Sequence, residues 1–294
     1  MSSGFVIINK PSGMSSSDVV IKCRNAYSKA IGKKIKCGHM GTLDPMASGI
    51  LIVAFGNATR LFDFTLKKRK TYVAKFQFGE ERDTLDACGE VTKTCALPEF
   101  QSVVDYLPNF IGKIDQVPPK YSAVNVNGKI AYDLARKGKD FEIAAKQVEI
   151  KDIKVLDKTL DGELCKDLTL SIICGGGTYI RSICRDLANG VGSAAYMSAL
   201  TRTESVGFEL ERDAVELQDF LIAPMNYVRS VKALTDSLMQ SVTLSESEYF
   251  KIRNGQSVVI DVKDGNYGAI YMDETSFILD VKNKIAKSVC FLES

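Results

Sequence analysis

The sequence predicts an α/β (α+β) domain over residues 1–235 and a small β-barrel domain over residues 236–294. Two observations predict this division. Up to about residue 230, short β-branched apolar runs alternate with segments whose apolar residues recur at helical spacing. From about residue 240, strand-like runs follow one another with only short turns and linkers between them. The composition of the 294 residues, 45% hydrophobic and 25% charged, is that of ordinary globular proteins.

The chain opens with a predicted strand and a predicted helix. Residues 4–10, GFVIINK, form a short apolar run that ends at Pro11, as a buried strand would. Ser15 and Asp18 have the spacing of a capping box, which predicts the start of a helix, and Gly32 is placed to end it. The apolar residues between them recur at helical spacing: Val20, Cys23, Tyr27 and Ala30.

Three further segments complete the predicted core of the first domain. Residues 50–55, ILIVAF, predict a buried strand. Residues 168–174, LTLSIIC, predict another strand, which leads through three glycines into a helix. The segment KTYVAKFQFG alternates, so its apolar residues share one face of a strand: Tyr72, Ala74, Phe76 and Phe78.

The C-terminal segment is predicted to begin with a short helix and continue as strands. Ser245 and Glu248 have capping-box spacing, and Gly255 is placed to end the helix. Four strand-like runs follow, SVVIDV, GAIYM, FILDV and SVCFLE, which favour a small β-barrel or roll.

Composition argues against several classes of protein. No apolar run approaches the roughly 20 residues that span a bilayer, and the first residues lack the pattern of a secretory signal. The eight cysteines fall singly inside apolar runs, where free thiols behave as small hydrophobic side chains. With one histidine and no C-x-x-C pair, a zinc site is not expected. We therefore expect a cytoplasmic protein with no membrane association and no metal.

Charge is distributed unevenly along the chain. The first 70 residues carry 12 Lys and Arg against three Asp, a net charge of +9, whereas the remainder carries 26 basic against 33 acidic residues. Because phosphates attract clustered Lys and Arg, this asymmetry favours a polyanionic partner. A solvated basic face with no partner is the alternative.

Asp44 is the most informative candidate for chemistry. It lies between a glycine-rich loop and a predicted strand, five residues after His39, the only histidine. Pro45 restricts the residue before it to extended geometry, which would fix the Asp44 backbone. A carboxylate held in this way can be a nucleophile, a general base or a metal ligand. The alternative is a carboxylate that only accepts hydrogen bonds from loop amides.

Arg181 and Tyr72 are weaker candidates. The segment GGGTYIRSICRDL lacks the G-x-G-x-x-G and G-K-[ST] patterns of nucleotide-binding loops. Arg181, in the first turn of a predicted helix, could pair with a buried carboxylate or make a surface contact. Tyr72 could be a plain core residue or, at a cleft, stack on a base. These residues alone indicate a nucleic-acid-binding protein with a carboxylate site and leave the substrate open.

Five segments then occur in a recognisable order: FVIINKPSGMSSSDVV, GHMGTLDPMASGILIVAFGNATR, KTYVAKFQFGEERDTLDACGEV, PPKYSAVNVNGKIAYDLARKG and GGGTYIRSICRDL. Together they resemble the TruB family of bacterial tRNA pseudouridine-55 synthases over nearly all of residues 4–210. The segment from about residue 240 resembles, more weakly, the small PUA-type RNA-binding module of many members. The resemblance implies a mixed, largely antiparallel sheet flanked by helices, followed by a PUA-like β-barrel at 236–294.

The resemblance also implies an activity. It is the isomerisation of uridine 55 in the T-loop of tRNA to pseudouridine, by base flipping and without a cofactor. Asp44 would be the essential carboxylate, which attacks the sugar, attacks the base or helps to remove a sugar proton. Arg181 would pair with Asp44, and Tyr72 would stack on the flipped uracil.

Further residues take implied roles in substrate binding. Tyr179 and Leu200 would line the uracil site, and His39 would occupy the space that the flipped nucleotide vacates. Lys10 and the basic N-terminal quarter would contact phosphates of the tRNA T-arm, and residues 119–147 resemble a mobile insertion that closes over RNA. We expect a monomer. A non-catalytic tRNA-binding or tRNA-folding protein on the same scaffold is the alternative function.

Overall fold

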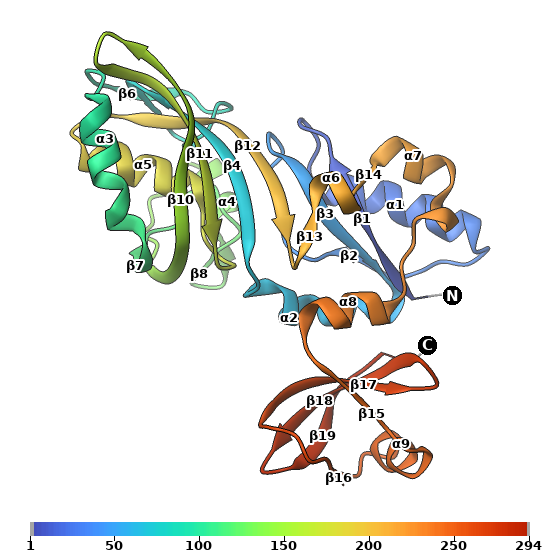
Figure 1. The fold of residues 1–294 in the computed structure, drawn as a ribbon. Coiled ribbons are helices and arrows are strands. Elements are labelled where there is room, and N and C mark those ends of the chain that lie inside the picture. The colour runs from blue at the N-terminus through green and yellow to red at the C-terminus, as the bar shows by residue number, and fades with distance from the viewer. Residues whose placement is uncertain (1–2, 293–294) are drawn as a thin grey trace. The chain divides into compact units, whose positions relative to one another are not determined.

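The computed structural model describes residues 3–292 of a mixed α/β chain, and its contacts divide the chain into two compact units (Figure 1). Unit 1 comprises Met1–Pro45, Gly49–Lys68 and Val206–Ser294, and unit 2 comprises Met46–Ser48 and Arg69–Ser205. Most strand pairs inside the units are antiparallel, and β1–β14 and β15–β17 are parallel. The predicted fold class is confirmed.

The N-terminal part of unit 1 is a small sheet covered by helices. Its strands run in the order β14-β1-β3, and β2 also pairs with β3. Helices α1 and α7 pack against each other, and α7 packs on β1 (Figure 1). The elements are β1 (Gly4–Lys10), α1 (Ser16–Ala30), β2 (Cys37–His39), β3 (Ser48–Phe55), α2 (Phe62–Leu66), β13 (Phe208–Glu209), α6 (Leu210–Asp213), β14 (Val215–Glu216), α7 (Leu217–Ile222) and α8 (Val231–Leu238).

Helix α1 begins and ends where the sequence predicts. The Ser15 hydroxyl accepts from the Asp18 amide while the Asp18 carboxylate accepts from the Ser15 amide, which completes the capping box. After the helix, Gly32 has a φ of +71°, a left-handed conformation that favours glycine. The buried stripe differs slightly from prediction, because Val19 is buried where Val20 was expected.

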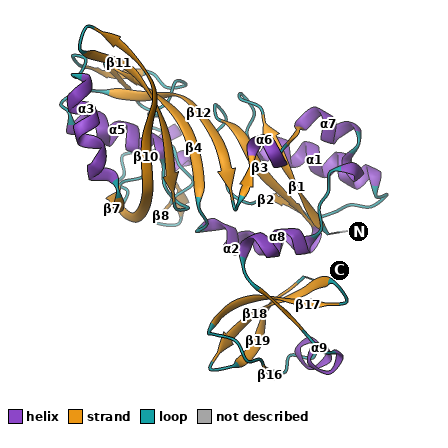
Figure 2. Ribbon diagram, viewed as in Figure 1, coloured by secondary structure: helices purple, strands orange, loops and turns teal. Residues whose placement is uncertain are grey.

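The C-terminal segment is a curled five-stranded sheet with one helix, drawn in Figure 2 with its strands orange and its helix purple. Its strands run in the order β15-β17-β18-β19-β16. One set of its apolar residues, including Tyr249 and Phe277, forms a core of its own, while Ile278 and Leu292 join the core of the N-terminal part of unit 1. The elements are β15 (Ser241–Thr243), α9 (Glu246–Arg253), β16 (Val258–Val259), β17 (Gly265–Tyr271), β18 (Glu274–Lys282) and β19 (Ile285–Phe291).

Unit 2 is built on an antiparallel sheet of order β12-β4-β11-β10-β7. Helices α3 and α5 contact each other, and both contact strands of this sheet (Figure 1). Strand β4 alternates as predicted, with Tyr72, Ala74, Phe76 and Phe78 buried. The elements are β4 (Lys70–Phe78), β5 (Glu80–Arg82), β6 (Val91–Thr94), α3 (Phe100–Tyr106), β7 (Gly112–Gln116), β8 (Asn125–Val126), β9 (Lys129–Ile130), α4 (Ala131–Arg136), β10 (Lys146–Asp161), β11 (Leu164–Cys174), α5 (Ile180–Gly190) and β12 (Ala195–Ser205).

The segment between β7 and β10 contains a small hairpin and a short helix. The hairpin β8–β9 turns at Asn127 and Gly128, which both have positive φ, as a tight two-residue turn requires. All eight cysteines are free thiols, and no helix in the described part of the chain is long and apolar enough to cross a membrane.

Candidate active site

The backbone on both sides of Asp44 is held by the turn that follows β1 and by the first residue of α1. The hydroxyl of Ser16, a residue only 3% exposed, donates to the Leu43 carbonyl oxygen at 2.7 Å and accepts from the Leu43 amide at 2.9 Å. The Gly13 amide donates to the Pro45 carbonyl oxygen at 2.8 Å. Because the residues before and after it are both held, the half-buried Asp44 has a fixed backbone. The N-terminal motif and the G-T-L-D-P motif therefore fold against each other.

Lys10 does not fit the role that the sequence implied. Its side chain is fully buried, and Nζ donates to the carbonyl oxygens of Pro11, Met14 and Pro45 at 2.9, 2.5 and 3.2 Å. These three bonds match the three donors of an ammonium group. The expected phosphate contact is therefore corrected, since the Lys10 ammonium is enclosed by backbone and helps to hold the chain beside Asp44.

Other basic residues of the N-terminal quarter do face solvent. Exposed cations follow one another along α1 and the loop after it: Lys22, Arg24, Lys29, Lys33, Lys34 and Lys36. No acidic residue lies between Asp18 and Asp44 in the sequence. This surface can attract a polyanion, whereas Lys10 cannot.

His39 is the last residue of β2, where it pairs with Val53 of β3, and it is half-buried. The next amide, of Met40, donates to the Ile52 carbonyl oxygen at 2.9 Å. Gly41 then has a φ of +128°, which side chains rarely tolerate, and the chain leaves the sheet toward Asp44. The glycine in this motif is thus needed for the path of the backbone.

Tyr72 and Leu200 share one face of the unit 2 sheet. Tyr72 lies opposite Ile172 on one neighbouring strand and Arg202 on the other, while Leu200 lies opposite Ala74. Opposed residues of antiparallel strands project from the same face, and so do alternate residues of one strand, which makes Tyr72 and Leu200 diagonal neighbours. They are 8% and 7% exposed.

Tyr179 is the N-cap residue of α5, and its backbone is held by one side chain. Its amide donates to Oε1 of Gln116 at 2.8 Å, and its carbonyl oxygen accepts from Nε2 of Gln116 at 3.1 Å. Gln116 is 1% exposed. This pair of bonds fixes the start of α5, and with it the origin of the Arg181 side chain.

The Arg181 guanidinium is buried among acceptors from two segments. Nη1 donates to the Thr84 carbonyl oxygen at 3.0 Å and lies 3.6 Å from Oδ2 of Asp86, while Nη2 donates to the Tyr121 carbonyl oxygen at 3.1 Å. The other oxygen of Asp86 accepts from the Thr84 hydroxyl at 2.7 Å and from the Cys88 amide at 3.0 Å. Arg181 and Asp86 are 5% and 6% exposed, so this ion pair is screened from water.

The predicted site residues thus form two sets. Lys10, His39 and Asp44 belong to unit 1, and Tyr72, Tyr179, Arg181 and Leu200 belong to unit 2. Within unit 2 the sheet brings Tyr72 beside Leu200, and α5 carries Tyr179 and Arg181 two residues apart. The pairing of Arg181 with Asp44 stays a prediction.

Sequence reasoning missed three buried polar residues of this region: Asp86, Gln116 and Arg202. Asp86 could have been found, because the DTLDACGE stretch around it is one of the matching segments and carries a carboxylate amid turn residues. Arg202 alternates with Leu200 along β12, which would place it on the same face. Nothing in the sequence around Gln116 signals its two bonds to Tyr179.

Comparison with known proteins decides the family. Residues 29–180 match the N-terminal domain of the TruB family pseudouridylate synthases. A tRNA pseudouridine synthase B of Borreliella afzelii is 36% identical over 96% of this chain and 95% of its own length. One of Microcystis aeruginosa is 43% identical over 74% of this chain and 72% of its own length. The chain belongs to the TruB family.

The fold of this pseudouridine synthase is also similar to that of solved structures. A chain from an H/ACA ribonucleoprotein bound to a substrate RNA containing 2′-deoxyuridine aligns with a TM-score of 0.71, covering 99% of this chain and 85% of that one. Their sequences are 19% identical, so this similarity supports the fold alone.

Proposed function

We propose that this TruB-family enzyme converts uridine 55 in the T-loop of tRNA to pseudouridine, with Asp44 as the catalytic carboxylate. The observation that carries the proposal is the set of hydrogen bonds that Ser16 and Gly13 make to the backbone of Leu43 and Pro45, here called the clamp. It holds one half-buried carboxylate, Asp44, in a motif typical of the family. Curated relatives with 36–43% identity are tRNA pseudouridine synthases.

The chemistry suits a site that offers a carboxylate and an arginine. The reaction breaks the N-glycosidic bond of uridine, turns the base and joins it to the same sugar through carbon, so no atom is gained or lost. A base inside a helix cannot reach a protein carboxylate, so the nucleotide must be flipped out. Asp44 then attacks the sugar or the base, or assists removal of a sugar proton.

The remaining residues would bind and orient the flipped nucleotide. Tyr72 stacks on the uracil, Tyr179 and Leu200 line its site, and His39 takes the space that the nucleotide leaves. Arg181 pairs with Asp44 and orients that carboxylate. The exposed cations of α1 and its loop contact T-arm phosphates in place of Lys10.

The test is pseudouridine formation on unmodified tRNA in the presence of EDTA, read by carbodiimide-blocked primer extension. We expect one stop in the T-loop with the wild-type protein. Asp44→Asn should abolish the stop while retaining the fold and tRNA binding, because the amide cannot act as nucleophile or base. A folded Asp44→Asn protein with wild-type turnover would refute the proposed role.

The competing function is a tRNA-binding or folding protein without catalysis. It predicts that wild-type protein binds tRNA and leaves every uridine unchanged. Under that function, Asp44→Asn and wild-type protein would be indistinguishable in both measurements. The protein would then act only by binding tRNA, mainly through phosphate contacts.

We further propose that residues 236–294 are an accessory RNA-binding domain of a cytoplasmic monomer. The segment has its own apolar core, and six basic against nine acidic residues make it a poor main phosphate-binding surface. Because α8 extends to Leu238, a truncation should end after Met239. We expect such a protein to bind tRNA more weakly and still form pseudouridine. Intact binding with no turnover would contradict this division.

A further inference from the structure

One contact of Arg181 comes from the segment between β7 and β10. Its Nη2 donates to the carbonyl oxygen of Tyr121, whereas its Nη1 donates to the carbonyl oxygen of Thr84 in the turn between β5 and β6. The guanidinium therefore joins two segments that are 37 residues apart in the sequence. A planar guanidinium can satisfy two carbonyls only while both stay in place.

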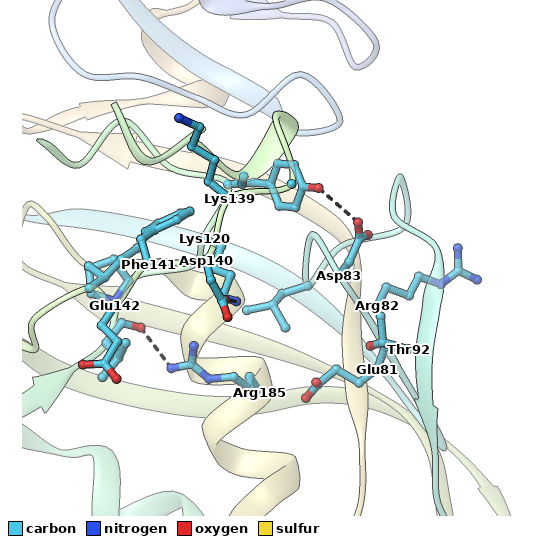
Figure 3. Close-up of a pocket in the computed structure, with 17 residues that line it drawn as sticks. Glu81, Arg82, Asp83, Thr92, Lys120, Lys139, Asp140, Phe141, Glu142 and Arg185 are labelled. Carbon is cyan, nitrogen blue, oxygen red and sulfur yellow. Dashed lines mark hydrogen bonds and ion pairs between the residues drawn. The ribbon is translucent and has the colours of Figure 1, made fainter. Parts of the chain in front are cut away.

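The Tyr121 side chain ties these same two segments together. Its hydroxyl donates to Oδ2 of Asp83 at 3.2 Å (Figure 3), and Oδ1 of Asp83 accepts from the Glu90 amide at 3.0 Å. Asp83 is thus anchored in its own turn and presents its second oxygen to Tyr121. Burial and the nearby Asp83 carboxylate raise the pKa of the Tyr121 hydroxyl, which therefore stays protonated as a donor.

Residues of the two segments also line a common cavity. This cavity has a volume of about 1040 Å³. It lies between Glu81 and Thr92 of the β5–β6 hairpin on one side and Lys139 and Phe141 on the other (Figure 3). Because a cavity offers no packing between its walls, the Tyr121–Asp83 bond is one of the contacts on which their mutual position depends.

Tyr121 is in turn linked to the exposed part of the insertion. Its ring meets the Tyr132 ring edge-on at 5.9 Å and 75°, and the Tyr132 amide donates to the carbonyl oxygen of Ser122 at 2.9 Å. The insertion also carries several solvent-exposed cations: Lys120, Lys129, Arg136, Lys137 and Lys139. RNA phosphates that bind these cations would shift the insertion, and with it the Tyr121 carbonyl that contacts Arg181.

We propose that Tyr121 is a positioning residue whose hydrogen bond to Asp83 holds its own carbonyl on Arg181, so that the insertion controls the orientation of the guanidinium. This proposal rests on the catalytic role proposed for Arg181. The orientation of Arg181 then depends on where the insertion lies, and contact of the insertion with tRNA is transmitted to the site through one backbone carbonyl.

The test compares Tyr121→Phe with Tyr132→Phe, a matched change on the other ring of the same pair. The rate constant is measured in single turnover at saturating tRNA, and the tRNA dissociation constant by filter binding. We expect Tyr121→Phe to slow the reaction about tenfold with an unchanged dissociation constant, since one hydrogen bond is lost and no phosphate contact changes. Tyr132→Phe should react at the wild-type rate.

Coupling to Arg181 is tested in the Arg181→Lys background. A lysine cannot bridge two carbonyls, so Tyr121→Phe should cause no further loss there. The same tenfold loss in both backgrounds would overturn the proposal, and so would a wild-type rate for Tyr121→Phe alone. Asp83→Ala removes the acceptor at the other end of the bond and is used if Tyr121→Phe fails to fold. It should also slow the reaction about tenfold and cause no further loss in the Arg181→Lys background.

The outcomes also separate this proposal from the proposed function. If Arg181→Lys turns over at the wild-type rate, the catalytic role of Arg181 fails, and with it the basis of the coupling. If Arg181→Lys is slow while Tyr121→Phe is normal, only the coupling fails.

Discussion

The loop that carries Asp44 is held through its backbone, whereas Arg181 is held through its side chain. Around Asp44, the bonds go to the peptide groups of Leu43 and Pro45, and they come from the turn after β1 and the first residue of α1. Around Arg181, the acceptors include two carbonyls and the Asp86 carboxylate, which come from segments distant in the sequence. Replacing a residue that holds the Asp44 loop should therefore lower stability and rate together, and so should replacing an acceptor of Arg181, whereas Arg181→Lys should act mainly on the rate.

Arg181→Lys should cause the largest loss of rate, since a lysine lacks the planar set of N–H donors that the buried guanidinium provides. We expect a fall in single-turnover rate of about 10²–10³-fold, the range for losing one preorganised donor at a reacting centre. The tRNA dissociation constant should change little, because affinity comes mainly from phosphate contacts. Arg185→Lys, one turn further along α5, is the control. Equal losses in binding and rate would show that Arg181 contacts the RNA backbone.

Asp86→Asn tests whether the carboxylate beside Arg181 matters for its charge. The amide keeps a similar shape but removes the negative charge that lies 3.6 Å from the buried guanidinium. We expect a rate about tenfold lower and an unfolding free energy about 1–3 kcal/mol lower, the cost of weakening a charged hydrogen-bonded group. Asp115→Asn on β7, at an exposed position, should change neither. An unchanged rate would limit Asp86 to a structural role.

The contrast between the two regions also explains what the sequence could predict. The capping boxes at Ser15 and Ser245 and the alternation of β4 are local patterns, and the structure confirms them. The roles of Lys10 and Asp86 depend on which segments meet after folding. Spacing in one sequence carries no information on that, so Lys10 was assigned to phosphates and Asp86 was missed.

Ser16→Ala should lower both the reaction rate and the free energy of unfolding, because it removes bonds that hold the Asp44 loop. The hydroxyl serves both the amide and the carbonyl of Leu43, and its loss leaves two buried peptide groups without a partner. We expect unfolding free energy to fall by about 1–3 kcal/mol in urea titrations, together with a lower rate. Ser17→Ala, the next residue of α1 and exposed, should have little effect. A slower enzyme of unchanged stability would argue against the clamp.

The last expected effect is that of pH on stability, in which a buried thiol and a buried amine act in opposite directions. Burial and the Asp167 carboxylate raise the pKa of Cys165 to about 11. Above the thiol's ordinary value of 9.0 the unfolded chain loses this proton while the folded chain keeps it, so stability should fall between pH 9 and 11 by about 1.4 kcal/mol per pH unit for each such thiol.

The buried ammonium of Lys70 should give the opposite slope. Burial and Arg202 lower its pKa to about 8, so the unfolded chain holds this proton to higher pH and stability rises between about pH 8 and 10.5. Cys165→Ala should make the measured slope of unfolding free energy against pH less negative, and Lys70→Met should make it more negative. Packing losses in either variant shift the curve without changing its slope. A Cys165→Ala slope equal to wild type would show that this thiol titrates alike in both states.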